Sequence, residues 1–126
     1  MIPYGKQSIN QEDINAVINV LKSDFLTQGP MVPLFEKVVS EYCKVNYAVS
    51  TNSATSALHL ACLALSLSPG DWLWTSPISF VASANCGLYC GAQIDFVDID
   101  PETYNMSIDS LKHKLIDAEI HGKLPK

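Results

Sequence analysis

Residues 50–57, with the sequence STNSATSA, have the composition of an anion-binding turn. A short β-like run, residues 47–49, precedes them, and an apolar helical run, residues 58–65, follows. The first N–H groups of a helix have no intrahelical partner, and the helix dipole favours negative charge there. A strand that turns into a helix through small hydroxyl residues can therefore hold a phosphate. An ordinary N-cap uses the same residue types, and the local sequence alone favours the N-cap.

The chain has 126 residues, of which 48% are hydrophobic and 17% charged, and its net charge is −5. This length suits one small domain with a buried core. All eight basic residues are Lys, so no nucleic-acid surface is expected, and backbone and hydroxyl donors would have to hold an anion. The sequence shows no signal-peptide pattern and no apolar stretch long enough to span a bilayer, which predicts a cytoplasmic protein without membrane contact.

No metal site is expected. The four cysteines form no C-x-x-C pair and should behave as small hydrophobic residues; they are Cys43, Cys62, Cys86 and Cys90. Asp98 and Asp100 precede a Pro-Glu pair and are interpreted as turn caps rather than cation ligands. His59 lies one turn into an apolar helix and is interpreted as structural.

Two helices are predicted in the N-terminal third of the chain. Asn10 and Asp13 resemble a capping box at the start of the first, which should cover residues 11–23. The second should cover residues 32–42, with Glu36 on its water-facing side.

The break between these helices, residues 24–30, places Phe25 and Leu26 among polar residues. Two interpretations stay open for it. It contacts a ligand, as loops that mix aromatic and polar residues often do, or it is a helix-to-helix turn with a buried Phe.

After residue 46 the sequence alternates between strand and helix patterns, which predicts an α/β fold with a parallel sheet and right-handed crossovers. We therefore divide the chain into an arm with two helices, residues 1–46, and a partial α/β domain, residues 47–126. The predicted strands cover residues 47–51, 72–76 and 93–99, and the predicted helices cover residues 54–66, 79–87 and a last segment that Ser107 caps. The apolar run at residues 72–74 predicts a strand buried on both faces, and the tail, residues 122–126, is expected to fray.

In such a sheet, ligands bind beyond the carboxyl ends of the strands. The hydroxyl segment at residues 50–57 and the turns at residues 77–80 and 98–100 each follow a predicted strand, so they meet at that edge. This convergence favours a phosphate site over a simple N-cap.

An ordered set of motifs resembles the start of the DegT/DnrJ/EryC1/StrS sugar aminotransferases. The motifs are LTQGP at residues 26–30, ATSALHLA at 54–61, FVASAN at 80–85 and FVDID at 96–100. The resemblance extends from Ile2 to about Leu115 and implies the N-terminal part of a fold type I large domain, like that of aspartate aminotransferase. The opening IPYG and the run SDFLTQGP are similar to the branch that aminates C4 of UDP-4-keto-6-deoxy-N-acetylhexosamine in pseudaminic acid synthesis.

The resemblance implies pyridoxal 5′-phosphate as the cofactor and a homodimer as the assembly. The residues that match the phosphate-binding segment of the family are Ala54, Thr55 and Ser56. Phe80 matches the aromatic residue that stacks on the pyridine ring. From the residues alone, Phe80 is more simply a core residue at the start of a helix.

The resemblance also implies glutamate as the amino donor and a nucleotide sugar as the substrate. The residues that match substrate-contacting positions are Tyr4, Asp24, Phe25, Leu26 and Thr27. The alternative interpretation of Tyr4 is a half-exposed anchor of the N-terminal arm.

The family needs a Lys that forms the internal aldimine, in a Ser-x-His-x-x-Lys context, and an Asp against the pyridinium nitrogen. None of the eight lysines has that context, so no catalytic residue is assigned and these 126 residues alone should be inactive. In the family's sheet, strands from later sequence lie between the first strand and the next two. The alternative function is a non-catalytic α/β module that binds an anion or a second chain. Another type of nucleotide-binding domain is disfavoured, because G-x-G-x-x-G and G-x-x-x-x-G-K are absent.

Overall fold

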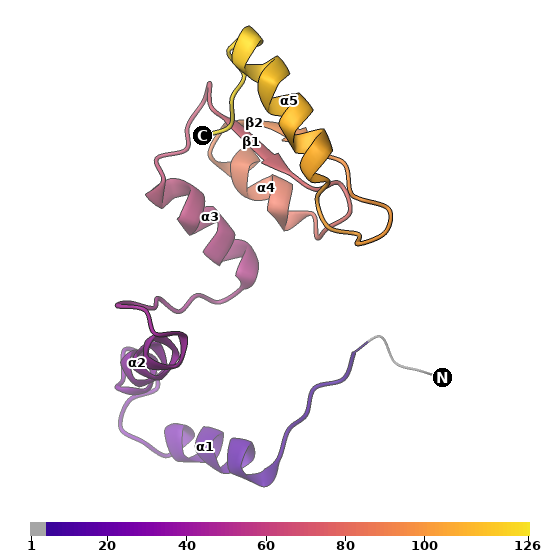
Figure 1. The fold of residues 1–126 in the computed structure, drawn as a ribbon. Coiled ribbons are helices and arrows are strands. Elements are labelled where there is room, and N and C mark those ends of the chain that lie inside the picture. The colour runs from indigo at the N-terminus through magenta and orange to yellow at the C-terminus, as the bar shows by residue number, and fades with distance from the viewer. Residues whose placement is uncertain (1–4) are drawn as a thin grey trace. The chain divides into compact units, whose positions relative to one another are not determined.

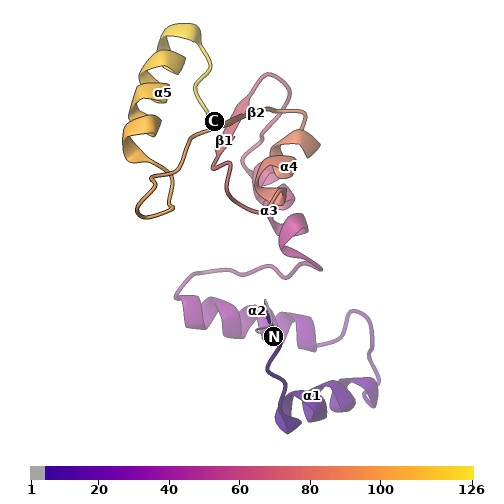
Figure 2. The same cartoon turned by 90° about the vertical axis from the view of Figure 1, so that its right-hand side faces the viewer.

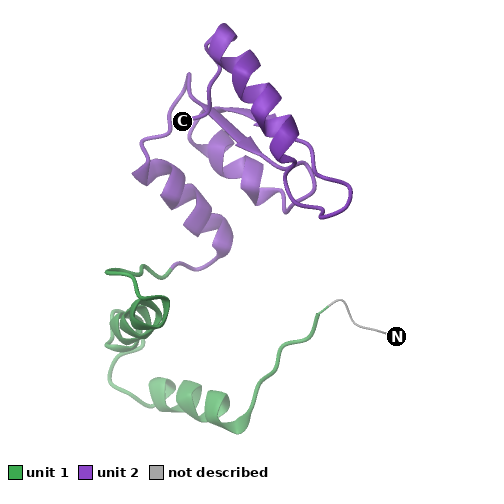
Figure 3. Cartoon of the chain, viewed as in Figure 1, with its two compact units in different colours: residues 1–50 green, residues 51–126 purple. Residues whose placement is uncertain are grey.

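The computed structural model describes residues 5–126, which divide into two compact units between Ser50 and Thr51 (Figure 3). Within the described residues, no helix has the length and apolar character needed to cross a membrane. The same part of the chain contains no group of three His, Cys, Asp or Glu residues arranged to hold a metal ion.

The first unit contains helices α1 (Gln11–Leu21) and α2 (Met31–Cys43) (Figure 1). The predicted capping box is confirmed. The Asn10 side-chain oxygen accepts the N–H of Asp13 at 3.0 Å, and the Asp13 carboxylate accepts the N–H of Asn10 at 2.9 Å. Lys44, with a left-handed φ of 55°, ends α2.

The apolar faces of α1 and α2 stay exposed, and neither helix has a buried residue among those described. Val17 and Leu21 of α1 are 60% and 64% exposed, and Phe35 of α2 is 59% exposed. Helical periodicity gathers apolar residues on one face of each helix, but burial needs a facing surface, which periodicity does not supply.

The second unit has the predicted α/β class. Its elements are α3 (Ala54–Ala64), β1 (Trp72–Thr75), α4 (Ala82–Tyr89), β2 (Gln93–Phe96) and α5 (Ile108–His121). The two strands pair in parallel, with Trp72 opposite Gln93 and Thr75 opposite Phe96. Figures 1 and 2 show α3 and α4 on one face of this pair and α5 on the other.

The buried side chains among the described residues all belong to the second unit. They are Cys62, Leu67, Ala82, Cys86, Ala92, Val97 and Ala118. Cys62 and Cys86 are buried, as predicted for small hydrophobic residues, and Cys90 is half-buried. The prediction is wrong for Cys43, which is exposed at the end of α2. Gly87 lets α4 approach the sheet closely, because a Cβ at this position would lie 2.6 Å from Ile94 Cδ1 and 3.2 Å from Leu73 Cβ.

The predictions for the strands need three corrections. Residues 47–51 form no strand. A strand needs a neighbour for its ladder hydrogen bonds, and among the described residues this segment pairs with none. β1 is half-buried rather than buried, because a sheet of two short strands leaves its side chains near the margin. β2 stops at Phe96, and Ile99 instead forms an antiparallel bridge with Met106.

The ends of other elements also differ from the predictions. The third helix ends at Ala64, because Ser66 takes a left-handed φ of 58°. α4 begins at Ala82 rather than at residue 79. The tail does not fray: Pro125 forms a parallel bridge with Trp72, and the N–H of Lys126 donates to the Trp72 carbonyl at 3.0 Å.

Candidate functional site

The first turn of α3 is held by Ser53, which acts as a true N-cap. Ser53 has extended backbone angles (φ −162°, ψ 156°), and its Oγ accepts the N–H of Ser56 at 3.2 Å. The hydroxyl of Ser56 donates to Asn52 Oδ1 at 2.7 Å. Both donors of Ser56 are therefore committed to this local network, although the resemblance assigns Ser56 to the phosphate.

The other first-turn donors are uncommitted. The first regular helical hydrogen bond runs from the N–H of Ala57 to the carbonyl of Ser53 at 3.1 Å. Within residues 5–126, the N–H groups of Ala54 and Thr55 and the hydroxyl of Thr55 find no acceptor. Three donors within two residues at a helix N-terminus fit the oxygens of a phosphate group.

The charges around this turn also suit an anion. Of the three helices that begin with a side-chain cap, α1 carries Glu12 and Asp13 in its first turn, and α5 carries Asp109. The first turn of α3 has no acidic residue. The dipole of α3 is therefore not neutralised by its own carboxylates, whereas those of α1 and α5 are.

Phe80 lies in the connection between β1 and α4 and is 73% exposed. The interpretation of Phe80 as a core residue is therefore wrong. Phe80 and Phe96 line a hollow of about 170 Å³, together with the end of β1 at Thr75. An exposed aromatic ring beside a hollow can stack on a flat ligand.

Ser76 adds a donor to the same hollow. Its Oγ is buried and has no hydrogen-bond partner among the described residues. A buried hydroxyl without a partner costs free energy, so a ligand atom or a water in the hollow would stabilise this group. The motifs did not single out Ser76, because its burial depends on packing between segments.

The topology places the first turn of α3 and the Phe80 connection at the same end of the second unit. The connection follows the carboxyl end of β1 directly. The C-terminal end of α3 leads into the amino end of β1. The N-terminal end of α3 therefore lies toward the carboxyl end of β1, as Figures 1 and 2 show. The predicted meeting of these segments at the carboxyl edge of the sheet agrees with this topology. The contacts of Ala54, Thr55, Ser56 and Phe80 with a cofactor remain a prediction.

The predicted substrate loop connects α1 and α2 in the first unit. Phe25 and Leu26 are 60% and 65% exposed, which excludes the turn with a buried Phe. Ser23 braces the loop, with its Oγ 2.7 Å from the Val20 carbonyl and 3.2 Å from the Phe25 carbonyl. The loop thus presents an apolar pair to its surroundings.

The substrate roles of this loop, from Asp24 to Thr27, stay predictions. Tyr4, the remaining predicted substrate residue, lies outside the described residues.

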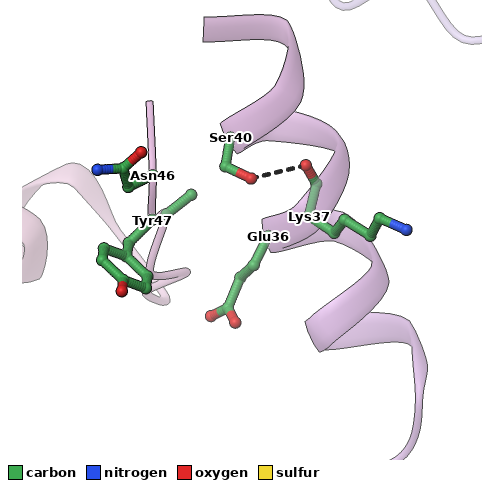
Figure 4. Close-up of a pocket in the computed structure, with 6 residues that line it drawn as sticks. Glu36, Lys37, Ser40, Asn46 and Tyr47 are labelled. Carbon is green, nitrogen blue, oxygen red and sulfur yellow. Dashed lines mark hydrogen bonds between the residues drawn. The ribbon is translucent and has the colours of Figure 1, made fainter. Parts of the chain in front are cut away.

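A shallow hollow of about 280 Å³ lies in the first unit between α2 and residues 46–48 (Figure 4). Glu36 lines it, and its Oε1 accepts both the N–H and the hydroxyl of Ser50 at 2.9 Å. These two hydrogen bonds lower the pKa of Glu36, and the bond from the backbone N–H of Ser50 has the larger effect. The expectation that Glu36 only faces water missed this contact, since a contact across fourteen positions leaves no local pattern in the sequence. A carboxylate already bound in this way is not free for chemistry.

The prediction that Asp100 caps a turn is confirmed. The Asp100 carboxylate caps its turn, because Oδ1 accepts the N–H groups of Glu102 at 2.9 Å and Thr103 at 2.8 Å. These N–H bonds lower the pKa of Asp100. His59 is half-buried and packs edge-on against Tyr89, with 5.2 Å between the ring centroids.

Comparisons with known proteins agree on one family. Residues 7–119 match the DegT/DnrJ/EryC1/StrS aminotransferase family. The UDP-4-amino-4,6-dideoxy-N-acetyl-beta-L-altrosamine transaminase of Campylobacter jejuni is 46% identical over 99 residues, which are 79% of this chain and 26% of that protein.

Two solved structures give the same result. Helicobacter pylori PseC, an aminotransferase involved in pseudaminic acid biosynthesis, has a TM-score of 0.81 and 37% identity, over 88% of this chain and 30% of the PseC chain. A Streptococcus pneumoniae protein described as a sugar aminotransferase, solved in its PLP form, has a TM-score of 0.84 and 32% identity, over 89% of this chain and 29% of that one. The chain spans 26% to 30% of the length of these relatives.

Proposed function

Because the chain belongs to the DegT/DnrJ/EryC1/StrS aminotransferase family, we propose that it forms the phosphate-binding part of a pyridoxal-phosphate-dependent sugar aminotransferase. The proposed reaction transfers an amino group from glutamate to the C4 ketone of a UDP-4-keto-6-deoxy-N-acetylhexosamine, in surface-glycan or flagellar-sugar synthesis. The Campylobacter and Helicobacter relatives support this substrate class. A cytoplasmic homodimer is part of the same proposal.

The observation that carries the proposal is the set of uncommitted donors at the start of α3. The N–H groups of Ala54 and Thr55, with the Thr55 hydroxyl, would bind the phosphate oxygens. Ser53 would keep the turn in shape through its bond to the N–H of Ser56, and Ser56 would contribute to the same turn. The site therefore needs no cationic side chain to hold the anion.

Phe80 would cover one face of the cofactor ring and exclude water from it. The bound cofactor supplies an electron sink for amino transfer. None of the eight lysines lies in the sequence context that the family uses for the covalent link, so the proposed role of this chain is to bind and orient. The exposed loop from Asp24 to Thr27, with Tyr4, is proposed to meet the nucleotide sugar.

Titration of the full 126-residue chain with pyridoxal phosphate, followed by ³¹P NMR and by the amide shifts of residues 54–56, tests this proposal. We expect saturable binding with shifts at Ala54 and Thr55, and weaker binding of Thr55→Ala by roughly three- to tenfold, which is the usual range for one lost hydrogen bond. Ser110→Ala is the control, because it removes a hydroxyl from the first turn of α5, outside the proposed site. It should bind like the unaltered chain.

Two further ligands separate the proposal from its alternative. Pyridoxal without phosphate should bind much more weakly, and inorganic phosphate should bind at the same residues but without shifting Phe80. Equal affinity for inorganic phosphate and pyridoxal phosphate would favour the anion-binding module. If no ligand shifts residues 54–56 while the spectrum shows a folded chain, both the cofactor site and the anion-binding module are contradicted.

A further inference from the structure

Three of the four thiols of the chain gather where α3 meets the end of α4. Cys62 of α3 and Cys86 of α4 belong to one buried cluster, and Cys90, the C-cap residue of α4, packs against it. The same two helices also meet through the rings of His59 and Tyr89, whose centroids lie 5.2 Å apart. The thiol of Cys62 therefore has the thiols of Cys86 and Cys90 as its neighbours.

The three thiols differ in their access to solvent. Cys62 and Cys86 are buried, at 8% and 3% exposed, whereas Cys90 is half-buried. The Cys86 Sγ also donates to the Ser83 carbonyl at 3.4 Å, which keeps this thiol turned back along its own helix. Oxidation of a thiol follows its exposure, so a small oxidant in solution would meet Cys90 first.

Helix geometry selects the partner of Cys90. Residues four positions apart on a helix hold their Cβ atoms about 5–6 Å apart, whereas a disulfide joins Cβ atoms about 3.5–4.5 Å apart. Cys90 keeps right-handed backbone angles (φ −87°, ψ −1°), so this spacing applies to Cys86 and Cys90. A bond between those two would distort the end of α4. Cys62, on the neighbouring helix, is the partner that remains.

We propose that Cys62 and Cys90 are a redox pair, which a hydroperoxide such as hydrogen peroxide oxidises to a disulfide between α3 and the end of α4. In the first step the Cys90 sulfur attacks a peroxide oxygen, the O–O bond breaks, and a sulfenic acid and one water form. In the second step the Cys62 sulfur attacks the Cys90 sulfur, and the S–O bond breaks with loss of a second water. The two thiols lose two hydrogens, and one hydrogen peroxide is reduced to two waters.

The burial of Cys62 makes the second step the slower one. Burial, with help from the neighbouring thiols, raises the pKa of Cys62 to about 11, so its reactive thiolate is scarce at neutral pH. The sulfenic acid at Cys90 should therefore persist long enough to be trapped by dimedone. Once formed, the disulfide closes a loop between α3 and α4 and restricts the unfolded state, which stabilises the second unit.

The test uses the full chain with Cys43→Ser, which removes the exposed thiol that would join two chains. The folded protein is treated with hydrogen peroxide, unfolded in iodoacetamide and digested with chymotrypsin, because cleavage after Tyr89 separates Cys86 from Cys90. We expect mass spectrometry to find the Cys62 and Cys90 peptides joined, with the loss of two hydrogens, and dithiothreitol to separate them. Dimedone added with the peroxide should label Cys90 and suppress the link.

Two further variants on this background assign the pair. Cys86→Ala should keep the link, and Cys90→Ser should lose it entirely and leave Cys62 reduced. The proposal is overturned if the folded chain joins Cys86 to either of the other two thiols, or if Cys90 forms no bond with Cys62. These outcomes are read from the Cys43→Ser chain itself, so they hold even if a further variant fails to fold. A link that forms as fast in denaturant would also overturn the proposal, because the fold would then not bring the pair together.

Discussion

Lys114 of α5 is tied to Asp95 of β2, with 2.7 Å between its Nζ and the Asp95 Oδ2. The same ammonium donates to the Phe96 carbonyl at 2.8 Å. The Lys114 side chain is 26% exposed and that of Asp95 44%. One lysine therefore joins the last helix to the end of the second strand, at the margin of the sheet where solvent screens the pair only in part.

This pair predicts a pH-dependent stability. The hydrogen bond from Lys114, followed by the N–H of Phe96, lowers the pKa of Asp95 below its usual value near 3.8. A lowered carboxyl pKa stabilises the fold above the unfolded-state value and loses that effect as the pH falls through the folded value. Asp95→Asn should therefore flatten the loss of stability between about pH 5 and pH 2, by at most about 1 kcal/mol after screening.

Thermal unfolding across this pH range measures the effect. Glu119→Gln is the control, because Glu119 is exposed on α5 and joins no ion pair in the described part of the chain. An Asp95→Asn profile parallel to that of the unaltered chain would contradict a role for this pair.

Gly87→Ala should destabilise the second unit. Its new methyl group would overlap Ile94 Cδ1 at 2.6 Å and press on Leu73 at 3.2 Å. Overpacking of this kind costs about 1–3 kcal/mol. Denaturant unfolding followed by Trp fluorescence reports it, since both tryptophans lie in β1. Gly5→Ala is the control, with nothing within 4 Å of its Cβ, and an equal effect of both changes would show that close packing at Gly87 is not the cause.

The stability losses of Ser53→Ala and Thr55→Ala should show which residue at the start of α3 holds the fold and which is free for a ligand. Loss of the cap to the Ser56 N–H should cost about 1 kcal/mol of stability, and Thr55→Ala should cost much less, because no hydrogen bond of its hydroxyl is formed among the described residues. Ser107→Ala removes the equivalent cap of α5 and should cost the same as Ser53→Ala. Chemical denaturation compares the three variants. A larger loss for Thr55→Ala than for Ser53→Ala would mean that Thr55 holds the fold rather than a ligand.

Cys62 should resist alkylation in the folded chain. Burial, with help from the neighbouring thiols of Cys86 and Cys90, raises the pKa of Cys62 to about 11 from its usual value of 9.0. The reactive thiolate is then about a hundredfold rarer at neutral pH. Cys43 is exposed and should react first with iodoacetamide. Mass spectrometry of labelled peptides locates each product, and Cys43→Ser should remove the fast phase. Equal labelling of Cys62 and Cys43 without denaturant would contradict the burial.

The 126-residue chain should not transfer amino groups by itself. With glutamate, a keto sugar nucleotide and pyridoxal phosphate, its rate should not exceed that of free pyridoxal phosphate. The physical reason is the absence of a Lys in the required sequence context. Mass spectrometry of the sugar product measures transfer. Turnover that depends on the protein concentration would contradict the prediction that these 126 residues are inactive alone.

Short-range features of this protein were predictable because they depend on residues within one helical turn. The Asn10–Asp13 box and the caps at Ser53 and Ser107 each join residues three positions apart. The turn at Asp100 is equally local. The α/β class followed from the alternation of strand and helix patterns, and the family followed from the resemblance of an ordered set of motifs.

The sequence by itself therefore determined where α3 and α5 begin, and which helix start offers free donors to an anion. Only the tertiary structure decided that residues 47–51 form no strand, that Phe80 is exposed, and that Glu36 receives two hydrogen bonds from Ser50. It also decided that the tail pairs with Trp72, which lies 53 positions before its partner Pro125. The reason is physical: a cap needs only its own turn, whereas a strand, a buried ring or a bound carboxylate needs a partner brought from elsewhere in the chain.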